Sequence, residues 1–497
     1  MRITNKMMTN NMLSNINKNK ISMSKLEEQY STGKKIQKPS DDPIITVRAL
    51  KLRTNLSELT QYYDKNIPDA MSWMDVTESA LTTVNRILKD INTYCVQGSS
   101  DTLKATNRKS IVQNLQQMKA QIYQEINSNY AGRYVFTGYK TDTPMVFDEK
   151  PKNISYEIQE QFKGEQIEYK NKVVGAYNLT NIDDPSIPND DPPQMTDVYR
   201  IQLSYDNIDH DIADISISYK EGNDVFTITP LTTYYSYEED AYQPTNGAHI
   251  ISDTGEIILS KDAYDKLKNS TNIDIKYKKS SFEKGDIRPE HYFDCTKEDL
   301  DAGKTITFTK TDAATGKKIS QDIEYEINYN QKLIINTEAS DAISLKVGRD
   351  IDEILNCVND VIKTEEKIAE VEKRLEDSSL TEDERERYEK ILEHLNTELE
   401  LKEEIMQKAF SNGITSSHNA QDKLNAAISD LGSRYVRLQL TESRLSSQKV
   451  DFEELLSTNE DADIVDTIVK FTSVHTLYNA SLQAAAKLVQ NSLLNFL

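Results

Sequence analysis

Residues 49–94 read ALKLRTNLSELTQYYDKNIPDAMSWMDVTESALTTVNRILKDINTY, and this stretch decides the fold class. From its first residue to its last, an apolar or aromatic side chain recurs in strict alternation of three and four residues, with Asn66 and Thr77 as polar breaks. A mean spacing of 3.5 residues keeps one stripe of a helix facing a partner, so the pattern predicts a coiled-coil-type seam on the order of 75 Å long. Pro68 lies within the seam and is expected to kink or split the helix.

The residues before the seam predict an earlier helix and a helix start. Met12, Ile16, Asn19, Met23, Leu26 and Tyr30 follow the same spacing of three and four. Gly33 is placed to end that first helix as a C-terminal cap. Ser40-Asp-Asp-Pro43 predicts the next helix start, because a side-chain hydroxyl caps free N–H groups and acidic residues with an early proline suit a first turn.

Residues 111–126 predict a third helix with Ile111, Leu115, Met118, Ile122 and Ile126 on one face. Residues 132–141, bounded by glycines and rich in aromatic side chains, predict a short strand after it.

Residues ~145–345 have a different pattern, in which polar and apolar residues alternate. Residues 215–219 and 225–228 predict a β-hairpin, and residues 306–308 are expected to pair with residues 323–327 through a turn at Gly316. An antiparallel β-rich domain is therefore predicted between the two helical ends.

Helical patterns resume from Ile351. Stripes within residues 361–406 predict a helical hairpin, and Asn412-Gly413 is expected to break the chain after it. A last stripe follows the 4,3 spacing, and it consists of Ile464, Ile468, Phe471, His475, Tyr478, Leu482, Ala485 and Val489.

The predicted fold is α+β, in which both chain ends form a discontinuous long-helix bundle or coiled coil and an antiparallel β-rich domain is inserted between them. The predicted segments are 1–35 and 464–497 as terminal helices, 36–147 and 411–463 as the two halves of a helical core, 148–345 as the insert and 346–410 as the hairpin.

Charge and composition argue against nucleic acid and the membrane as partners. The net charge is −22, yet residues 1–147 carry 20 Lys/Arg against 13 Asp/Glu, so the acidity lies in the middle of the chain. An acidic middle repels nucleic acid. No run of 18 apolar residues predicts a membrane span, and no apolar stretch near Met1 resembles a cleavable signal.

No catalytic, cofactor or metal motif is present in the sequence. Cys95, Cys295 and Cys357 are far apart and have no zinc-ligand spacing, and His394 and His475 have no second ligand nearby in sequence. Neither a phosphate-binding glycine loop nor a GxSxG or HExxH motif occurs. We therefore expect no enzyme activity and no cofactor.

Both ends resemble the flagellin superfamily. Met1-Arg-Ile-Thr-Asn-Lys-Met-Met, Leu26-Glu-Glu-Gln-Tyr-Ser-Thr-Gly-Lys-Lys-Ile and Pro39-Ser-Asp-Asp-Pro43 are similar to its start. The segment at 132–141 and the C-terminal residues 481–497 are most similar to its hook-associated protein 3 group, the hook–filament junction proteins. The resemblance covers residues 1–147 and 407–497. The three cysteines are a departure from it, because proteins of this family usually lack cysteine.

The resemblance implies an extracellular subunit at the hook–filament junction, exported unfolded through a type III apparatus without a cleaved signal. It implies as partners other copies of the chain, a neighbouring junction protein, flagellin and an export chaperone. It further implies terminal segments that are disordered in the monomer and become helical on assembly.

The apolar stripes within residues 45–130 are expected to pack mainly within their own chain. Residues 1–30 and 464–497, whose apolar stripes are sparse, are expected to pack on neighbouring subunits. The predicted assembly residues are Met12, Ile16, Met23, Leu26, Ile464, Ile468, Phe471, Tyr478, Leu482, Ala485 and Val489. Three alternatives stay open at this point: flagellin itself, an enzyme on a flagellin-like scaffold, and a coiled-coil scaffold unrelated to flagella.

Overall fold

The computed structural model describes residues 5–100, 105–175, 192–221, 224–238, 240–312, 317–377 and 380–494. They form two compact units. The terminal unit comprises the residues up to Asp69, Tyr325–Leu333 and the residues from Val436 on. The central unit comprises Ala70–Glu324 and Ile334–Tyr435.

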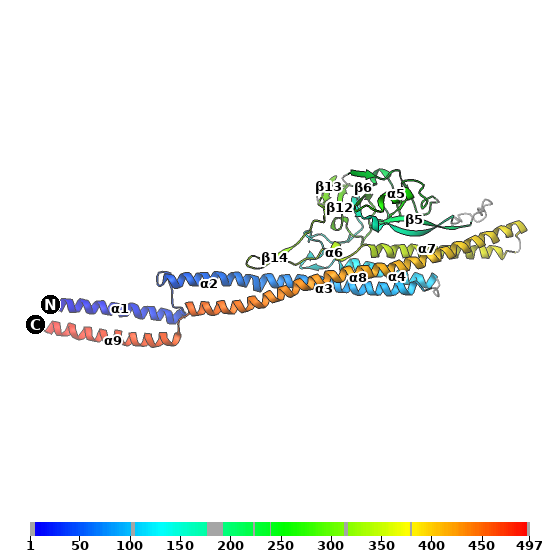
Figure 1. Ribbon diagram of the computed structural model, residues 1–497. Coiled ribbons are helices and arrows are strands. Elements are labelled where there is room, and N and C mark those ends of the chain that lie inside the picture. The colour runs from blue at the N-terminus through cyan, green and yellow to red at the C-terminus, as the bar shows by residue number, and fades with distance from the viewer. Residues whose placement is uncertain are drawn as a thin grey trace. The chain divides into compact units, whose positions relative to one another are not determined.

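Long helices dominate both ends of the chain (Figure 1). The α-helices are α1 (Asn5–Thr32), α2 (Pro43–Gln61), α3 (Ile67–Gly98), α4 (Ala105–Glu125), α5 (Lys261–Leu267), α6 (Ala339–Ala342), α7 (Lys346–Leu375), α8 (Glu382–Glu460) and α9 (Ile464–Leu494). Short helical turns are η1 (Tyr62–Asn66), η2 (Gly164–Gln166), η3 (Ile212–Asp214) and η4 (Pro289–His291).

The seam predicted from residues 49–94 is confirmed, because every one of its positions is buried or half-buried. The predicted interruption is present as well. Between α2 and α3 the turn η1 is a π-helix, in which the N–H of Ile67 bonds to the carbonyl of Tyr62. Pro68 follows at once, and its ring would clash with the carbonyl four residues earlier in a regular α-helix, so the wider turn accommodates it.

The ends of α1 and α2 have the expected positions, but one cap differs from the prediction. Gly33 ends α1 with a φ of +70°, and its N–H bonds to the carbonyl of Gln29 at 2.9 Å. At the start of α2 the cap is Asp42 and not Ser40: its Oδ1 accepts from the N–H groups of Ile44 and Ile45 at 3.0 and 3.1 Å. A carboxylate serves there because its charge also favours the helix N-terminus.

The predicted break at Asn412-Gly413 is wrong, because α8 continues through it to Glu460. Gly413 instead permits close helix packing. A Cβ at this position would lie 3.0 Å from both the Sγ of Cys95 on α3 and the Cδ1 of Ile354 on α7. The glycine is explained by the approach of three helices, which sequence periodicity alone does not reveal.

The predicted helical hairpin is confirmed. In the central unit α7 and the first part of α8 share a buried cluster formed by Val371, Tyr388, Ile391 and Leu395. Farther along α8, Asn425 accepts a hydrogen bond from Asn85 of α3 at 2.7 Å. These contacts join the N-terminal and C-terminal halves of the chain in one bundle.

The strands lie between the two helical ends. They are β1 (Asn129–Tyr130), β2 (Arg133–Tyr134), β3 (Ile154–Phe162), β4 (Glu168–Val174), β5 (Gln194–Gln202), β6 (Ser216–Glu221), β7 (Asp224–Thr227), β8 (Leu231–Tyr234), β9 (Ala248–Ile251), β10 (Glu256–Leu259), β11 (Ile273–Lys279), β12 (Asp294–Asp299), β13 (Lys304–Phe308), β14 (Glu324–Asn328) and β15 (Gln331–Ile334). A five-stranded sheet has the order β4-β5-β10-β9-β8, and a six-stranded sheet has the order β13-β12-β3-β11-β6-β7. All described pairings are antiparallel except β8 with β9.

The predicted strand pairings are partly right. The hairpin β6–β7 is confirmed, with Tyr219 opposite Phe226. The pairing of 306–308 with 323–327 is wrong, because β13 pairs with β12 and β14 pairs with β15, and Gly316 lies outside the described residues. The strand predicted at 132–141 is reduced to the small hairpin β1–β2, whose turn residues Ala131 and Gly132 both have positive φ.

One hydrophobic core joins the two larger sheets. Side chains from β5, β9 and β10 pack with side chains from β3, β6 and β11, and Ile201, Ile257, Ile217 and Ile275 are all fully buried in this cluster. The predicted architecture is thus confirmed: long helices from both chain ends pack together, and an antiparallel β-sheet domain is inserted between them.

Candidate assembly surface

The segment that follows α1 and the segment that precedes α9 are joined by hydrogen bonds within the terminal unit. The N–H of Lys35 bonds to the carbonyl of Glu460 at 2.7 Å, and the N–H of Ala462 bonds to the carbonyl of Gly33 at 2.8 Å. The Nζ of Lys34 lies 2.6 Å from Oδ1 of Asp461. These bonds place the end of α1 beside the start of α9, so the two helices run side by side with both chain termini at one end (Figure 1).

The facing sides of α1 and α9 form a narrow contact. Asn19 on α1 donates from Nδ2 to Oγ of Ser481 on α9 at 3.3 Å. On the same stripe of α1, Ile16 is buried, and Met12, Met23 and Leu26 are half-buried. The four assembly residues predicted on α1 therefore lie on the side of the helix that faces α9 of the same chain.

The assembly residues predicted on α9 divide into two groups. Phe471, Tyr478 and Ala485 are half-buried, in line with Ser481. Ile464, Ile468 and Leu482 are exposed, with 52%, 42% and 42% of their surface accessible. Val489 lies in the last part of α9, where only the backbone is described. The role of all these α9 residues in assembly stays a prediction.

Sequence periodicity missed part of the stripe on α9 that faces α1. Thr467 is buried, and Val474 and Ser481 are half-buried. Two of these three residues carry a hydroxyl, so a search for apolar positions did not select them. The exposed group on α9 consequently belongs to another face of the helix, which has no partner among the described residues.

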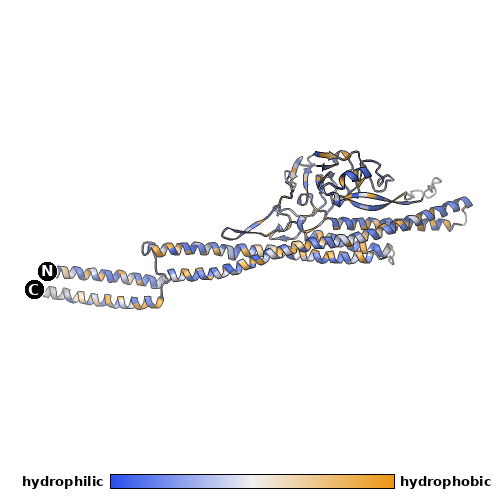
Figure 2. Ribbon diagram, viewed as in Figure 1, coloured by the Kyte–Doolittle hydropathy of each residue, from blue (hydrophilic) through white to orange (hydrophobic). Residues whose placement is uncertain are grey.

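Exposed apolar side chains are frequent throughout the terminal unit, whose helices show hydrophobic residues along their length (Figure 2). They are Met7, Met8, Leu13, Ile21 and Tyr30 on α1, Ile44, Val47 and Leu50 on α2, Val436, Leu440, Val450 and Leu455 on α8, and Ile464, Val465, Ile468, Val469, Leu477 and Leu482 on α9. Extended exposed apolar surface of this kind marks an interaction site.

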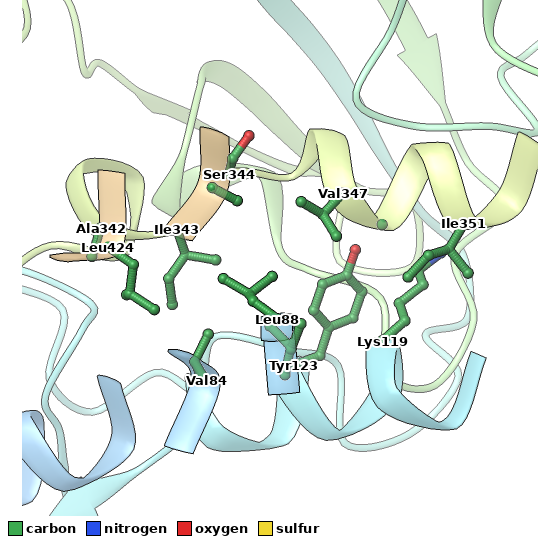
Figure 3. Close-up of a pocket in the computed structure, with 13 residues that line it drawn as sticks. Val84, Leu88, Lys119, Tyr123, Ala342, Ile343, Ser344, Val347, Ile351 and Leu424 are labelled. Carbon is green, nitrogen blue, oxygen red and sulfur yellow. The ribbon is translucent and has the colours of Figure 1, made fainter. Parts of the chain in front are cut away.

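The central unit contains a cavity that is too small for a substrate. Its volume is about 20 Å³, and Val84 and Leu88 of α3, Tyr123 of α4 and Val347 of α7 line it (Figure 3). Such a space holds about one water molecule. The described residues also include no group of three or more His, Cys, Asp or Glu side chains placed to bind a metal ion.

The most concentrated charges of the central unit are in a buried cluster around Arg200. Its guanidinium bonds to Glu168 at 2.6 Å, to Glu353 of α7 at 2.9 Å and to Glu256. Burial alone would raise the pKa of Glu256, but the charges of Lys172 and Arg200 outweigh it and bring the pKa to about 2. The carboxylates are thus held ionised by fixed cations, which suits a structural joint between the five-stranded sheet and α7.

The three cysteines are thiols in packed surroundings. Cys95 and Cys295 are buried, and Cys357 is half-buried. Burial raises the pKa of Cys95 and Cys357 to about 12, and it raises that of Cys295 as well. A thiol with a raised pKa is a poor nucleophile, so these residues do not resemble a catalytic cysteine.

Within the described ranges, no helix has the length and apolar content needed to cross a membrane.

Both helical ends of the chain match known protein families. Residues 3–141 match the family described as the bacterial flagellin N-terminal helical region, and residues 414–497 match the bacterial flagellin C-terminal helical region. The two matches include α1, α2, α3 and α4 at one end and most of α8 with α9 at the other.

Individual relatives match over similar lengths. Flagellar hook-associated protein 3 of Escherichia coli K12 is 31% identical over 155 residues, which is 31% of this chain and 49% of the relative. The protein of that name from Salmonella typhimurium LT2 is 34% identical over 143 residues, or 29% of this chain and 45% of the relative. A flagellin from Clostridium tyrobutyricum is 33% identical over 122 residues, or 24% and 32%. The chain therefore spans about half the length of the hook-associated relatives.

A solved structure of flagellar hook-associated protein 3 from Legionella pneumophila covers 82% of this chain and 97% of its own length, with 10% identity and a TM-score of 0.28. Similarity at that level carries no conclusion about function.

Proposed function

The chain belongs to the flagellin family, whose N-terminal and C-terminal helical regions form its two ends, and on that premise we propose that it is a structural subunit of the bacterial flagellum. Within the flagellum it joins the hook to the filament as a hook-associated protein. It has no catalytic role. The similarity to hook-associated protein 3 of two bacteria, over 155 and 143 residues, supports the more specific assignment.

The observation that carries this proposal is the exposed apolar surface of the terminal unit. Ile464, Val465, Ile468 and Val469 of α9 are exposed. The contact between α1 and α9 covers only one stripe of side chains on each helix. Removing such side chains from water is favourable by roughly 25 cal/mol per Å² of apolar surface. Burial against neighbouring subunits therefore stabilises α1 and α9, and the exposed members of the predicted assembly residues, Ile464, Ile468 and Leu482, are part of that contact.

The mechanism is assembly. Terminal helices of adjacent copies interlock into a tubular inner layer, while the central unit sets the outer surface. The partners are other copies of the chain, a neighbouring hook-associated junction protein and flagellin. Before assembly, an export chaperone binds the C-terminal helix and a type III apparatus exports the chain unfolded without a cleaved signal peptide. The working location is extracellular, at the hook–filament junction.

Flagellin itself is the second candidate, supported by the match to the flagellin of Clostridium tyrobutyricum. A strain that lacks this chain separates the two functions. If the chain is the junction protein, the strain makes hooks without filaments and releases intact flagellin into the medium. A strain whose medium and cells contain no flagellin would identify the chain as the filament subunit, and a strain with normal flagella would contradict both assignments.

A further inference from the structure

Helix α2 and the C-terminal part of α8 are antiparallel neighbours in the terminal unit (Figure 1). The carbonyl of Ile45, near the start of α2, accepts a hydrogen bond from Nδ2 of Asn459, near the end of α8, at 3.1 Å. At the other end Asp64, just after α2, forms an ion pair with Lys449 of α8 at 3.0 Å. Each helix therefore turns one side toward the other helix and has an outer face on the opposite side.

The outer face of α2 is apolar and basic. Val47, Arg48 and Lys51 lie on it together, because residues three and four apart are neighbours on a helix surface. All three side chains are exposed, Val47 to 52%. Arg48 and Lys51 form no ion pair with any other residue that the structure describes, whereas Arg53, on the side toward α8, bonds to Glu460 at 2.6 Å.

The outer face of α8 is apolar and acidic, with the same spacing. Val450, Asp451 and Glu454 lie on it together, and all three are exposed, Val450 to 60%. Neither Asp451 nor Glu454 forms an ion pair within the described ranges. The two outer faces thus have the same pattern, a valine followed at once and again three residues later by a charge, and the charges are of opposite sign.

We propose that the outer face of α2 of one copy packs on the outer face of α8 of the next copy, with Val47 against Val450 and Arg48 beside Asp451. The inference rests on the proposed assembly of the chain into the flagellum and supplies a contact between copies outside the terminal helices. Copies that have the same orientation along the flagellar axis bring these two helices together antiparallel, as they are within one copy.

Antiparallel packing suits the shared spacing of the two faces. The two valines meet on one side of the contact, and Arg48 and Asp451 meet on the other side, because the charge follows the valine in each helix. One turn away, Lys51 lies within reach of Asp451, and Glu454 lies within reach of Arg48. Complementary charges of this kind select the partner face and its register.

The other combinations of these faces lack the complement. Packing of α2 on a second α2 brings Arg48 and Lys51 of two copies together without an acid. Packing of α8 on a second α8 gathers Asp451 and Glu454 without a base, and like charges at an interface repel. The contact between α2 and α8 is head-to-tail, so each copy keeps one free face of either kind and the contact can repeat from copy to copy around an axis.

The first test uses cysteine variants of the full chain in purified flagella. The double variant Val47→Cys with Val450→Cys is expected to form disulfide-linked multimers on mild oxidation, because facing residues of packed helices have Cα atoms about 6 Å apart, within reach of a disulfide. Each single variant is one control, since the native cysteines remain in it. Val47→Cys with Leu440→Cys is the second control, because Leu440 is also exposed on α8 but lies about 15 Å along the helix from Val450. At least tenfold fewer multimers are expected from both controls.

A charge exchange gives an independent measurement. Arg48→Asp with Lys51→Glu, and Asp451→Arg with Glu454→Lys, are each expected to lower the number of incorporated copies several-fold. The four changes combined are expected to restore incorporation, because every pair of opposite charges is present again. Double-cysteine chains that incorporate without multimers above the single-variant level overturn the inference, and so do charge variants that all incorporate like the wild type. Absence of the wild-type chain from purified flagella would instead overturn the proposed function.

Discussion

The side-chain amide of Asn19 donates a hydrogen bond to the hydroxyl of Ser481 over 3.3 Å, which brings together residues 462 positions apart in the sequence. The bond lies in the middle of the α1–α9 pair, where one stripe of each helix is covered and the rest is exposed. A pair of helices with so little buried surface gains little to offset the entropy of ordering the chain. We therefore expect the pair to be less stable in the free subunit than in the proposed assembly.

Limited proteolysis of the purified free chain tests this difference. We expect cleavage within residues 1–30 and 464–497 at protease concentrations that leave α3 and the central part of α8 intact. The physical reason is that local opening of α1 and α9 costs little free energy, whereas opening α3 exposes a continuous buried seam. Mass spectrometry of the fragments identifies the sites. Terminal helices that resist cleavage as long as α3 does would favour a constitutively helical scaffold instead.

Gly413→Val is expected to lower the free energy of unfolding of the central unit by about 2 kcal/mol, because a Cβ would come within 3.0 Å of Cys95 and Ile354 and overpack the meeting point of three helices. Thermal unfolding measures the change. The matched control is Gly432→Ala in the same helix, where a Cβ meets nothing within 4 Å. That variant is expected to gain up to about 1 kcal/mol, since alanine is the better helix former. Equal effects of the two variants would refute the packing role of Gly413.

Arg200→Met is expected to destabilise the central unit by about 3 kcal/mol or more, because it leaves Glu168, Glu256 and Glu353 without their shared cation. Chemical denaturation with urea measures the loss. Lys150→Met provides the comparison, since Lys150 and Glu283 form a surface pair in which both side chains are about two-thirds exposed. A change within about 1 kcal/mol is expected for that variant. A small effect of Arg200→Met would mean that the buried cluster contributes little.

Asp350 provides a prediction of pH dependence. It is buried on α7, and burial raises its pKa from 3.8 to about 6, although a hydrogen bond with Ser416 opposes the shift. A carboxyl whose pKa is higher in the folded state than in the unfolded state contributes most in its protonated form. That contribution is complete below about pH 3, and it declines as the pH rises from there to about 6.

The comparison variant is Asp350→Asn, which does not titrate. The free energy of unfolding of the wild type relative to this variant is expected to fall by about 3 kcal/mol between pH 3 and pH 7, as a shift of about two pKa units implies. Urea denaturation across this range measures the difference. A difference that does not vary with pH would show that the carboxyl titrates normally.

Periodicity predicted the helices well because it reports which side of a helix is apolar. The seam at 49–94, the split near Pro68 and the end of α1 at Gly33 all follow from local sequence. Periodicity does not report the partner. Local sequence predicts a helix break at Gly413 because its neighbours Cys95 and Ile354 are distant in sequence. It predicts the wrong partner for β13 because pairing in a sheet depends on long-range contacts.

The candidate assembly residues show the same limit. On α1 the predicted positions form one stripe, and the structure turns that stripe toward α9. On α9 the apolar pattern runs around two faces, so it selected Ile464 and Ile468 on the exposed face and omitted Thr467 and Ser481 on the face toward α1. A polar residue that packs between two helices leaves no signal in an apolar pattern.

The most direct test of the central claim asks whether the terminal helices carry the chain into the flagellum. A chain lacking residues 464–497 is produced in a strain without the wild-type gene, alongside a full-length Ile468→Asp, Val469→Asp variant and a Ser473→Asp control on the same helix. Quantitative immunoblotting of purified hook–filament preparations measures incorporation. We predict no incorporation of the truncated chain, at least tenfold less of the double variant and near-normal levels of the control. Truncated protein built into normal flagella would contradict the account.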